Sequence, residues 1–390
     1  MKTNAPEASA VPNQPATKRT ALAGISRRSF LTTAGAAAAS LPFSGLRESV
    51  AQEAGDAAEI PGVDREPVVI KTQGSFMVGG TVITAANGDT FHGDHAYVQY
   101  QIPPGARRLP LVMWHGGGQF SKTWESTPDG RDGYQNIFLR RGFSTYILDE
   151  PRRGRAGRGT EGSTLTLGVP NESTNWGIFR LGRWPDFFPG VQFPGAYSAY
   201  ALDQYMRQQT PDTGPAFDLA HRHILIDAVA KLFDKIGPAV LLTHSASGRL
   251  GWPTRIQSPN VKAIVCYETG SFVFPEGEVP VPPPPHEAIP VPLSDFLKLT
   301  TIPIQIVFGD NIPTTPTTPA NLDQWRTAFA QAKIFVDTVN RHGGDAKILH
   351  LPDVGIYGNT HFSFSDLNNL QVADQLSKYL HENDLDRRDD

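Results

Sequence analysis

The stretch that decides the fold is Ala239-Val240-Leu241-Leu242-Thr243-His244-Ser245-Ala246-Ser247-Gly248, an apolar run that leads directly into small residues. A serine at the end of a buried strand exposes its hydroxyl only in a strained turn, and the positions two before and two after it must then be small. Thr243 and Ser247 stand there, where glycines are usual. The stretch predicts a strand, a sharp turn that presents Ser245 as a nucleophile, and a helix.

Similar apolar runs recur on both sides of this stretch, separated by segments compatible with helices. They are residues 109–114, 143–148, 261–267, 302–308 and 346–351. Continuous apolar runs that alternate with helices are typical of a mostly parallel sheet buried on both faces. Upstream, the β-prone stretches 68–70 and 97–100 lie on either side of an Asn87-Gly88 turn signal, which favours antiparallel pairing. We therefore expect an α/β fold with a mostly parallel central sheet and leading antiparallel strands.

A glycine-rich turn follows the first of these runs. It reads His115-Gly116-Gly117-Gly118-Gln119. Such a turn leaves backbone N–H groups uncovered, and acyl transfer needs these donors for the oxyanion of its transition state. Alone, the motif would indicate only a tight turn. Its position well upstream of Ser245 favours an oxyanion site formed by Gly117, Gly118 and Ala246.

The candidate general base is His361. It ends the segment Gly355-Ile356-Tyr357-Gly358-Asn359-Thr360-His361, between the run 346–351 and a helix-like segment at 367–380. A base histidine is expected on the loop after the last strand. His342 precedes that strand and His350 lies within it. Of these three histidines, His361 alone is on the expected loop.

Taken in this order, the motifs resemble those of the α/β-hydrolase superfamily over residues 67–385. More narrowly, four motifs resemble a small group of secreted or periplasmic bacterial serine esterases: His115-Gly116, Thr123-Trp124-Glu125, Pro128-Asp129-Gly130-Arg131 and Gly358-Asn359-Thr360-His361. That group places its acid, a Glu, just after the strand that follows the nucleophile helix. The resemblance implies the α/β-hydrolase fold, esterase chemistry without a cofactor or a metal ion, and Glu268 as the acid.

Asp310 is the competing acid. It follows the strand-ending Gly309, and the usual acid of the fold lies after this strand, but some residues beyond the glycine. Glu268 ends a strand nearer the nucleophile, and its longer side chain can reach further. A structural interpretation is open for each residue: a buried pair with an arginine for Glu268, and a turn-capping carboxylate for Asp310.

Two insertions interrupt the alternation of strands and helices. Residues 160–215 are rich in aromatic residues among Gly and Pro, and residues 275–292 contain Pro282-Pro283-Pro284-Pro285, which favours an extended polyproline segment. We predict a lid-like insertion that contacts the substrate through Trp184, Phe187 and Phe188, with Gln119 also lining the site. The alternative is that these aromatic residues pack into the core.

The N-terminus predicts export. Ser26-Arg27-Arg28-Ser29-Phe30-Leu31 resembles a twin-arginine signal, and the weakly apolar run 31–43 after it is too short to span a bilayer comfortably. Ser49-Val50-Ala51 offers a cleavage site. We expect residues 1–51 to be a signal peptide, residues 52–390 to be one catalytic domain, and the mature protein to be periplasmic or secreted without stable membrane insertion. A basic tail is the alternative.

Charge and composition exclude other classes. Without residues 1–51 the chain has 29 basic and 37 acidic residues, so it has no basic footprint for nucleic acid. The eleven His lack the spacing of a structural zinc site, and the single Cys266 is expected to be a small buried residue on a strand. Composition does not predict an oligomeric state.

The functional prediction is a serine hydrolase that cleaves a carboxylic ester of a small molecule through Ser245, His361 and Glu268. The same triad could act on a lactone, an amide or a carbon–carbon bond. A non-catalytic binding protein of this fold is the third interpretation, and the joint presence of nucleophile, acid, base and oxyanion turn argues against it.

Overall fold

A computed structural model describes residues 66–160, 172–210, 222–281 and 286–388. All of them belong to one compact unit, Ala58–Asp390. Within it, Cys266 is fully buried on a strand, as predicted.

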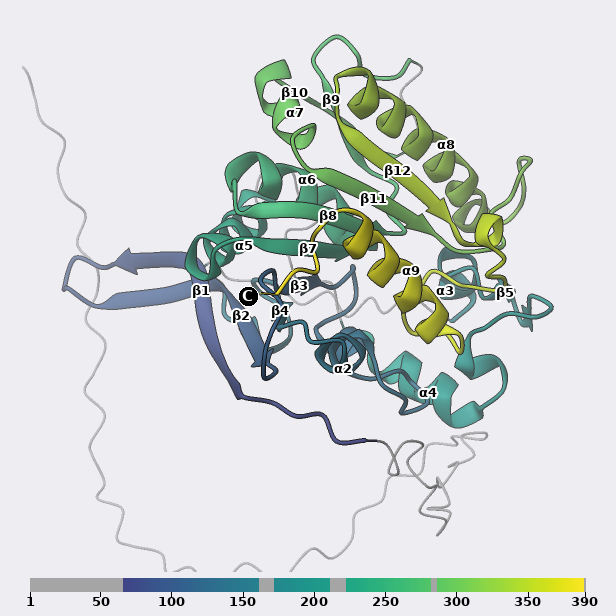
Figure 1. The fold of residues 1–390 in the computed structure, drawn as a ribbon, viewed down its shortest axis with the longest axis horizontal. Coiled ribbons are helices and arrows are strands. Elements are labelled where there is room, and N and C mark those ends of the chain that lie inside the picture. The colour runs from purple at the N-terminus through teal and green to yellow at the C-terminus, as the bar shows by residue number, and fades with distance from the viewer. Residues whose placement is uncertain (1–65, 161–171, 211–221, 282–285, 389–390) are drawn as a thin grey trace, which may run out of the picture. The chain divides into compact units, whose positions relative to one another are not determined.

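An eight-stranded sheet forms the centre of this unit (Figure 1). Its order is β1-β2-β4-β3-β7-β8-β11-β12; β1–β2 and β2–β4 pair antiparallel, and all the other neighbours pair parallel. The strands are Thr72–Thr84, Thr90–Ile102, Leu111–Trp114, Thr145–Asp149, Ala239–His244, Val261–Tyr267, Pro303–Phe308 and Asp345–His350, for β1, β2, β3, β4, β7, β8, β11 and β12. The predicted α/β class, parallel sheet and leading antiparallel strands are confirmed.

One strand prediction is wrong. Residues 68–70 lie outside any strand, and β1 begins at Thr72. Thr72 pairs with Ile102, the last residue of β2, so the chain before it has run past the end of its partner. The predicted turn does connect the two strands, and Gly88 in it adopts a φ of +89°.

Two cores cover the two faces of the sheet, because successive residues of each parallel strand point to opposite sides. Along β7, Leu241 belongs to one core and Leu242 to the other. The first core also contains residues of α5 (Arg222–Ile236), α6 (Gly248–Gln257), α7 (Leu293–Leu299) and α8 (Ala320–Arg341). The second contains residues of α2 (Tyr134–Arg140) and α9 (Asn369–Glu382). Helices on both faces explain the continuously apolar strands.

The insertion at 160–215 packs inward. Its described part contains α3 (Glu172–Ile178), the short pair β5 (Gly182–Arg183) and β6 (Asp186–Phe187), and α4 (Ala199–Arg207). Trp176, Phe179 and Phe193 are buried in the second core. For Trp176 and Phe193 the core interpretation is the one observed.

The insertion at 275–292 contributes to a small parallel pair, β9 (Phe272–Pro275) with β10 (Ala288–Val291). The predicted polyproline segment at 282–285 lies outside the described residues. The remaining short helix, α1, spans Lys122–Glu125 after β3.

Candidate active site

Ser245 occupies the sharp turn between β7 and α6. Its φ is +52°, a left-handed conformation that non-glycine residues rarely adopt and that needs support from its surroundings. Ser247 provides part of it: its Oγ accepts the N–H of His244 at 2.9 Å and lies 3.0 Å from the carbonyl oxygen of Trp114 on β3. The residue that stands in place of a glycine therefore ties the turn to the neighbouring strand.

Close packing around the turn requires glycine at two other positions. A Cβ on Gly116 would lie 2.8 Å from Nδ1 of His244 and 3.0 Å from Cβ of Ser245. A Cβ on Gly248 would lie 2.4 Å from Oγ1 of Thr269. The glycine-rich turn after β3 and the start of α6 can approach the serine only because these side chains are absent.

Ser245 faces a cavity of about 340 Å³. Gly117, Gly118 and Ala246, the three predicted oxyanion residues, line the same cavity. Gly118 has a φ of +65°, and its carbonyl oxygen accepts the N–H of Thr210 at 2.8 Å. Within the described part of the chain, no acceptor is recorded for the N–H groups of Gly117 and Gly118. The glycine-rich turn and the start of the turn at Ser245 therefore meet at one cavity, and their role as an oxyanion site stays a prediction.

His361 lies on the loop between β12 and α9, and it is only 1% exposed. Its backbone is held from two sides: its N–H donates to the carbonyl oxygen of Phe179 at 3.0 Å, and its carbonyl oxygen accepts from Nε2 of His244 at 2.9 Å. The imidazole contacts Trp325, with ring centroids 4.5 Å apart. His244, the residue before Ser245, therefore helps to place this histidine, a role that no sequence signal indicated.

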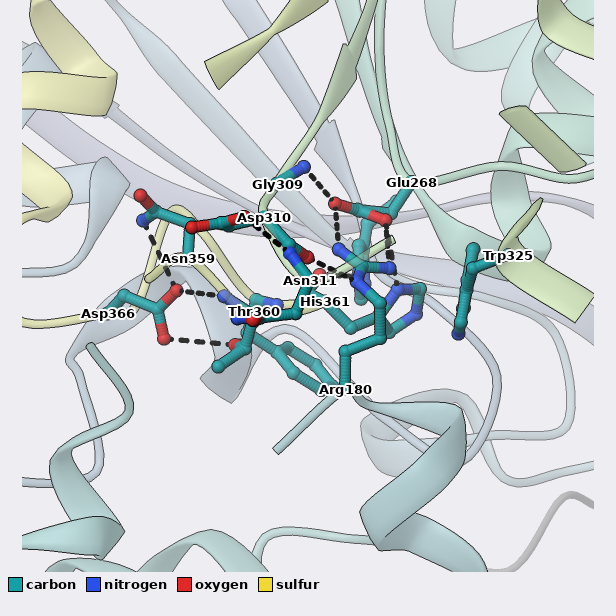
Figure 2. A network of polar contacts seen from close by, with 12 residues as sticks. Arg180, Glu268, Gly309, Asp310, Asn311, Trp325, Asn359, Thr360, His361 and Asp366 are labelled. Carbon is teal, nitrogen blue, oxygen red and sulfur yellow. Dashed lines mark hydrogen bonds and ion pairs between the residues drawn. The ribbon is translucent and has the colours of Figure 1, made fainter. Parts of the chain in front are cut away.

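Glu268 lies beside His361 and is fully buried (Figure 2). Its Oε2 is 3.7 Å from Nδ1 of His361, an ion-pair distance longer than a hydrogen bond. Arg180 donates to both carboxylate oxygens, at 2.6 and 2.7 Å, and the N–H of Gly309 donates to Oε1. The sequence left two alternatives for Glu268, a pair with an arginine and a position facing the histidine. In the structure both occur together.

The charges in this cluster suit a general base. Burial alone would raise the pKa of Glu268, but Arg180 and His361 outweigh it and lower the pKa to about 2. Burial lowers the pKa of His361, opposed by Glu268 and assisted by Arg180. At neutral pH the carboxylate is therefore charged, while the imidazole is neutral and able to accept a proton.

Asp310 has a different role in the same region (Figure 2). Its Oδ1 accepts the N–H of Asn311 at 2.6 Å, and its Oδ2 accepts the N–H of Gly358 at 2.7 Å. Its own N–H donates to the carbonyl oxygen of Asn359 at 2.8 Å. This is the turn-capping arrangement, and it fixes the histidine loop through the backbone.

Asp366 also binds this loop and was not singled out from the sequence. Its carboxylate accepts the N–H and the hydroxyl of Thr360, at 2.7 and 2.9 Å, and the amide of Asn359 at 3.3 Å (Figure 2). Burial raises the pKa of Asp366 to about 7, although these hydrogen bonds oppose it. Only its position five residues after His361 could have suggested this role.

Two of the motifs that carried the resemblance contact this loop and the start of α9. Arg131 donates to Oδ1 of Asn369 at 2.9 Å and to the carbonyl oxygen of Asp366 at 3.1 Å. Trp124 stacks on Phe364 with centroids 4.2 Å apart. Arg131 thus binds residues 235 and 238 positions later in the chain.

The four residues predicted to contact substrate are not on the wall of the cavity. Gln119 is 1% exposed and buried behind it. Phe187 packs on Trp176 at a centroid distance of 4.7 Å, Phe188 packs half-buried against the second core, and Trp184 is 48% exposed with its ring edge-on to Trp176. Their part in binding stays a prediction, without support from this geometry.

Other residues form the wall, and most of them gave no signal in the sequence. They are Asn175, Ile178, Phe179, Gln209, Thr210, Arg249, Gly270, Ser271, His286, Gln324 and Trp325. They come from both insertions, from the starts of α6 and α8, and from the segment between β8 and β9. Spacing along the chain carries no information about such a surface, because it forms only when the loops meet.

Among residues 66–160, 172–210, 222–281 and 286–388, no group of three or more His, Cys, Asp or Glu is arranged to hold a metal ion. No helix in these same ranges is long and apolar enough to cross a membrane.

Known proteins that resemble this chain over most of its length include a solved esterase structure and a secreted lipase. A bacterial esterase of solved structure is 33% identical and superposes with a TM-score of 0.68, covering 83% of this chain and 99% of that chain. A protein named "Probable secreted lipase phiG" from Fungal sp. (strain ATCC 74256) is 25% identical over 327 residues, which is 75% of this chain and 87% of that protein. No family model matches the chain.

Proposed function

Because the chain belongs to the α/β-hydrolase superfamily, we propose that it is an exported serine esterase that cleaves a small carboxylic ester through an acyl-enzyme on Ser245. The observation that carries this proposal is the buried Glu268–His361 pair beside a cavity that also contains Ser245 and the glycine-rich turn. These are the parts that acyl transfer requires.

The proposed reaction begins when the hydroxyl of Ser245 attacks the ester carbonyl. Because Nδ1 of His361 faces Glu268, Nε2 is the nitrogen that takes the serine proton and later returns it to the leaving alcohol. Glu268 holds the ring in this tautomer and stabilises the imidazolium that forms. Water then repeats the cycle on the acyl-enzyme and releases the acid.

The N–H groups of Gly117 or Gly118 and of Ala246 would stabilise the oxyanion. All three residues line the cavity beside Ser245. Donors fixed in advance in a water-poor site stabilise the charge that develops in the transition state without having to reorganise. No step of this chemistry needs a metal ion or a cofactor.

Ester cleavage is favoured over the alternatives by the names of the similar proteins, an esterase and a secreted lipase. Cleavage of a lactone, an amide or a carbon–carbon bond would use the same groups. The secreted relative and the motif around Arg27-Arg28 support export, which we assign to the twin-arginine route. We further propose that residues 1–51 are the signal and residues 52–390 one catalytic domain.

Substitution of Ser245 tests the proposal. Ser245→Ala should lower the turnover of p-nitrophenyl butyrate by a factor of up to about a million, the scale seen when other serine hydrolases lose their nucleophile. The thermal midpoint should not fall, because the change deletes only the hydroxyl. The wild type should be labelled by a fluorophosphonate probe and the variant should not.

The matched control is Ser75→Ala, at an exposed position on β1. It should react like the wild type in both assays. Near-normal turnover by a folded Ser245→Ala protein would refute the mechanism.

A further inference from the structure

The charged side chains on the cavity wall are already paired. Among the described lining residues they are Glu268 and Arg249. Glu268 accepts two hydrogen bonds from Arg180, and Arg249 forms an ion pair with Glu287 at 3.2 Å. The other polar side chains of the wall are amides, hydroxyls and one imidazole. Selection of a ligand by hydrogen bonds therefore falls to these uncharged groups.

The amide of Asn175 is one of them. Asn175 lies on α3, is 4% exposed and lines the cavity, and its side chain forms no hydrogen bond with the residues that the structure describes. The helix is held against the start of α8 by its backbone: Nδ2 of Asn321 donates to the carbonyl oxygen of Thr174 at 2.8 Å, and Nε1 of Trp325 donates to that of Ile178 at 2.7 Å. Asn175 is thus fixed in place without using its amide.

The hydroxyl of Ser271 is the second group. Ser271 lies between β8 and β9, is 2% exposed and also lines the cavity. Its backbone is held on both sides, since its N–H donates to Oγ1 of Thr269 at 3.4 Å and its carbonyl oxygen accepts from Nε1 of Trp252 at 2.9 Å. Its Oγ has no partner in the described part of the chain.

Nδ1 of His286 is the third group. Nε2 of this ring lies 2.8 Å from the carbonyl oxygen of Gln324, which can only accept, so Nε2 carries the proton. Burial lowers the pKa of His286, with a smaller contribution from Arg249, and the ring is therefore neutral at neutral pH. Nδ1 is then an acceptor without a partner among residues 66–160, 172–210, 222–281 and 286–388. It lies against Gly270, the residue before Ser271, where a Cβ would come within 2.9 Å of it.

Unpaired groups in a buried wall distinguish strongly between polar and apolar ligands. A ligand that displaces water without replacing its hydrogen bonds leaves such groups unsatisfied, and this costs free energy. A site of this kind therefore discriminates between a hydroxyl and a methyl group far better than an apolar pocket can. A hydroxyl suits all three groups because it both donates and accepts, whereas a carboxylate could not donate to Nδ1 of His286.

We infer that the enzyme selects esters whose acyl or alcohol part carries a hydroxyl group, as in esters of hydroxy acids or of polyols, and that Asn175, Ser271 and His286 bind it. The inference rests on the proposed esterase function and specifies its substrate class. The hydroxyl can belong to either side of the ester bond, and the test separates the two cases.

The test compares two pairs of esters in which a methyl group is replaced by a hydroxyl of similar size. The acyl part differs between p-nitrophenyl butyrate and p-nitrophenyl 3-hydroxypropanoate. The alcohol part differs between n-propyl butyrate and 2-hydroxyethyl butyrate, whose cleavage is followed by titration of the released acid. Within each pair the ratio of kcat/KM, hydroxylated over methyl ester, is divided by the same ratio for hydrolysis by hydroxide, which removes differences in intrinsic reactivity.

In at least one pair the corrected ratio of the wild type should be about ten or more, the scale of a hydrogen bond to a buried group. Asn175→Ala and Ser271→Ala each delete one partner, and His286→Gln removes Nδ1 while its amide nitrogen can still donate to Gln324. At least one of these variants should lower the ratio about three- to tenfold. Turnover of the methyl ester should stay within about threefold of the wild type, because it makes none of these hydrogen bonds.

The control is Ser75→Ala, which removes an exposed hydroxyl outside the cavity wall and should leave both ratios unchanged. Folding should survive Ser271→Ala in particular, since its Oγ binds nothing in the described part of the chain.

A wild-type ratio no greater than one in both pairs would overturn the inference. A preference for the hydroxylated ester that none of the three variants lowers would overturn it as well. The proposed function would still stand if the methyl esters were cleaved and the fluorophosphonate probe reacted. Failure of both of those assays would instead refute the esterase itself.

Discussion

Arg180 determines how the buried carboxylate of Glu268 can be tested. The two side chains are both fully buried and share two hydrogen bonds. Removing one partner of such a pair leaves the other charge buried without a counter-charge, which typically lowers the free energy of unfolding by about 3–5 kcal/mol. A variant of Glu268 alone can therefore lose activity for two reasons, the loss of the acid and the loss of the fold.

A double variant separates these reasons. Glu268→Gln should slow acylation by about four orders of magnitude, the scale known for a triad whose imidazole has the wrong tautomer. It should also lower the thermal midpoint, because Arg180 loses its counter-charge. Arg180→Met with Glu268→Gln should recover the midpoint but not the activity.

Asp310→Asn is the comparison for the same experiment, since Asp310 binds backbone N–H groups of its own turn and of the loop. It should reduce turnover much less than Glu268→Gln does. A crippled Asp310→Asn enzyme beside a nearly normal Glu268→Gln enzyme would reverse the assignment of the acid.

At the scale of elements, the sequence predicted the strands well because burial on both faces leaves an unmistakable apolar run. The run 261–267 coincides with β8, and the run 346–351 differs from β12 by one residue at each end. The failure at 68–70 has a physical cause: β propensity does not reveal where the partner strand ends. Pairing is a property of two segments, and here β2 stops at Ile102.

The insertion at 160–215 shows how far the residues of the candidate site could be predicted from the sequence. Its aromatic density indicated burial correctly but not which surface the rings face. Phe179 and Trp176 are both buried, yet only Phe179 lines the cavity. Arg180, which follows Phe179, provides the positive charge that pairs with Glu268. Its backbone has a positive φ of 52°, which nothing in the local sequence indicates. Ser245 and His361 could be proposed from the sequence because the chemistry expected of them fixes their order along the chain, whereas the residues around them are fixed only by tertiary contacts.

A prediction for this insertion follows from its packing. Phe187 is half-buried between Trp176 and Phe193, with centroids 4.7 and 6.1 Å away. Phe187→Ala should lower the free energy of unfolding, by less than the roughly 3–5 kcal/mol of a fully buried phenylalanine. The ranking of a panel of acyl-chain lengths should not change, since the ring is not on the cavity wall.

Chemical denaturation beside the ester panel checks this. Trp184→Ala, at a more exposed ring of the same cluster, should cost less stability and serves as the control. A changed ranking with an unchanged free energy of unfolding would instead support the original prediction that Phe187 contacts the substrate.

At the scale of the whole molecule, some buried ionisable groups stabilise the protein as the pH rises, and Asp366 has the opposite effect. The pKa of Glu268 is lowered to about 2, so its stabilising contribution is present above its ordinary pKa and is lost only as the pH falls towards 2. The buried rings of His115, His244 and His361 have lowered pKa values, so they favour the folded state increasingly as the pH rises to about 6.5. Asp366 has the opposite sign to these histidines over the same range.

The last prediction isolates Asp366. Its pKa of about 7 in the folded protein lies above its ordinary value of 3.8, so between these values the folded state keeps a proton that the unfolded state has released. The contribution of Asp366 to stability is therefore full below about pH 4 and falls as the pH rises to about 7, by up to about 1.4 kcal/mol per pH unit.

The variant Asp366→Asn tests this because its side chain cannot titrate. Its free energy of unfolding should lack, at every pH, the contribution of the one hydrogen bond that an amide cannot accept from Thr360 or Asn359. Burial raises the pKa of the neighbouring phenol of Tyr205 well above its ordinary value, so the phenol stays protonated throughout this window, and the histidine contributions cancel in the difference between the two proteins. Urea denaturation at pH 4.5, 6, 7 and 8 should show the wild type losing stability relative to Asp366→Asn from pH 4.5 to about 7 and changing little from 7 to 8. A difference that stays the same at all of these pH values would mean that Asp366 is already ionised at pH 4.5, held as an anion by the loop that carries His361.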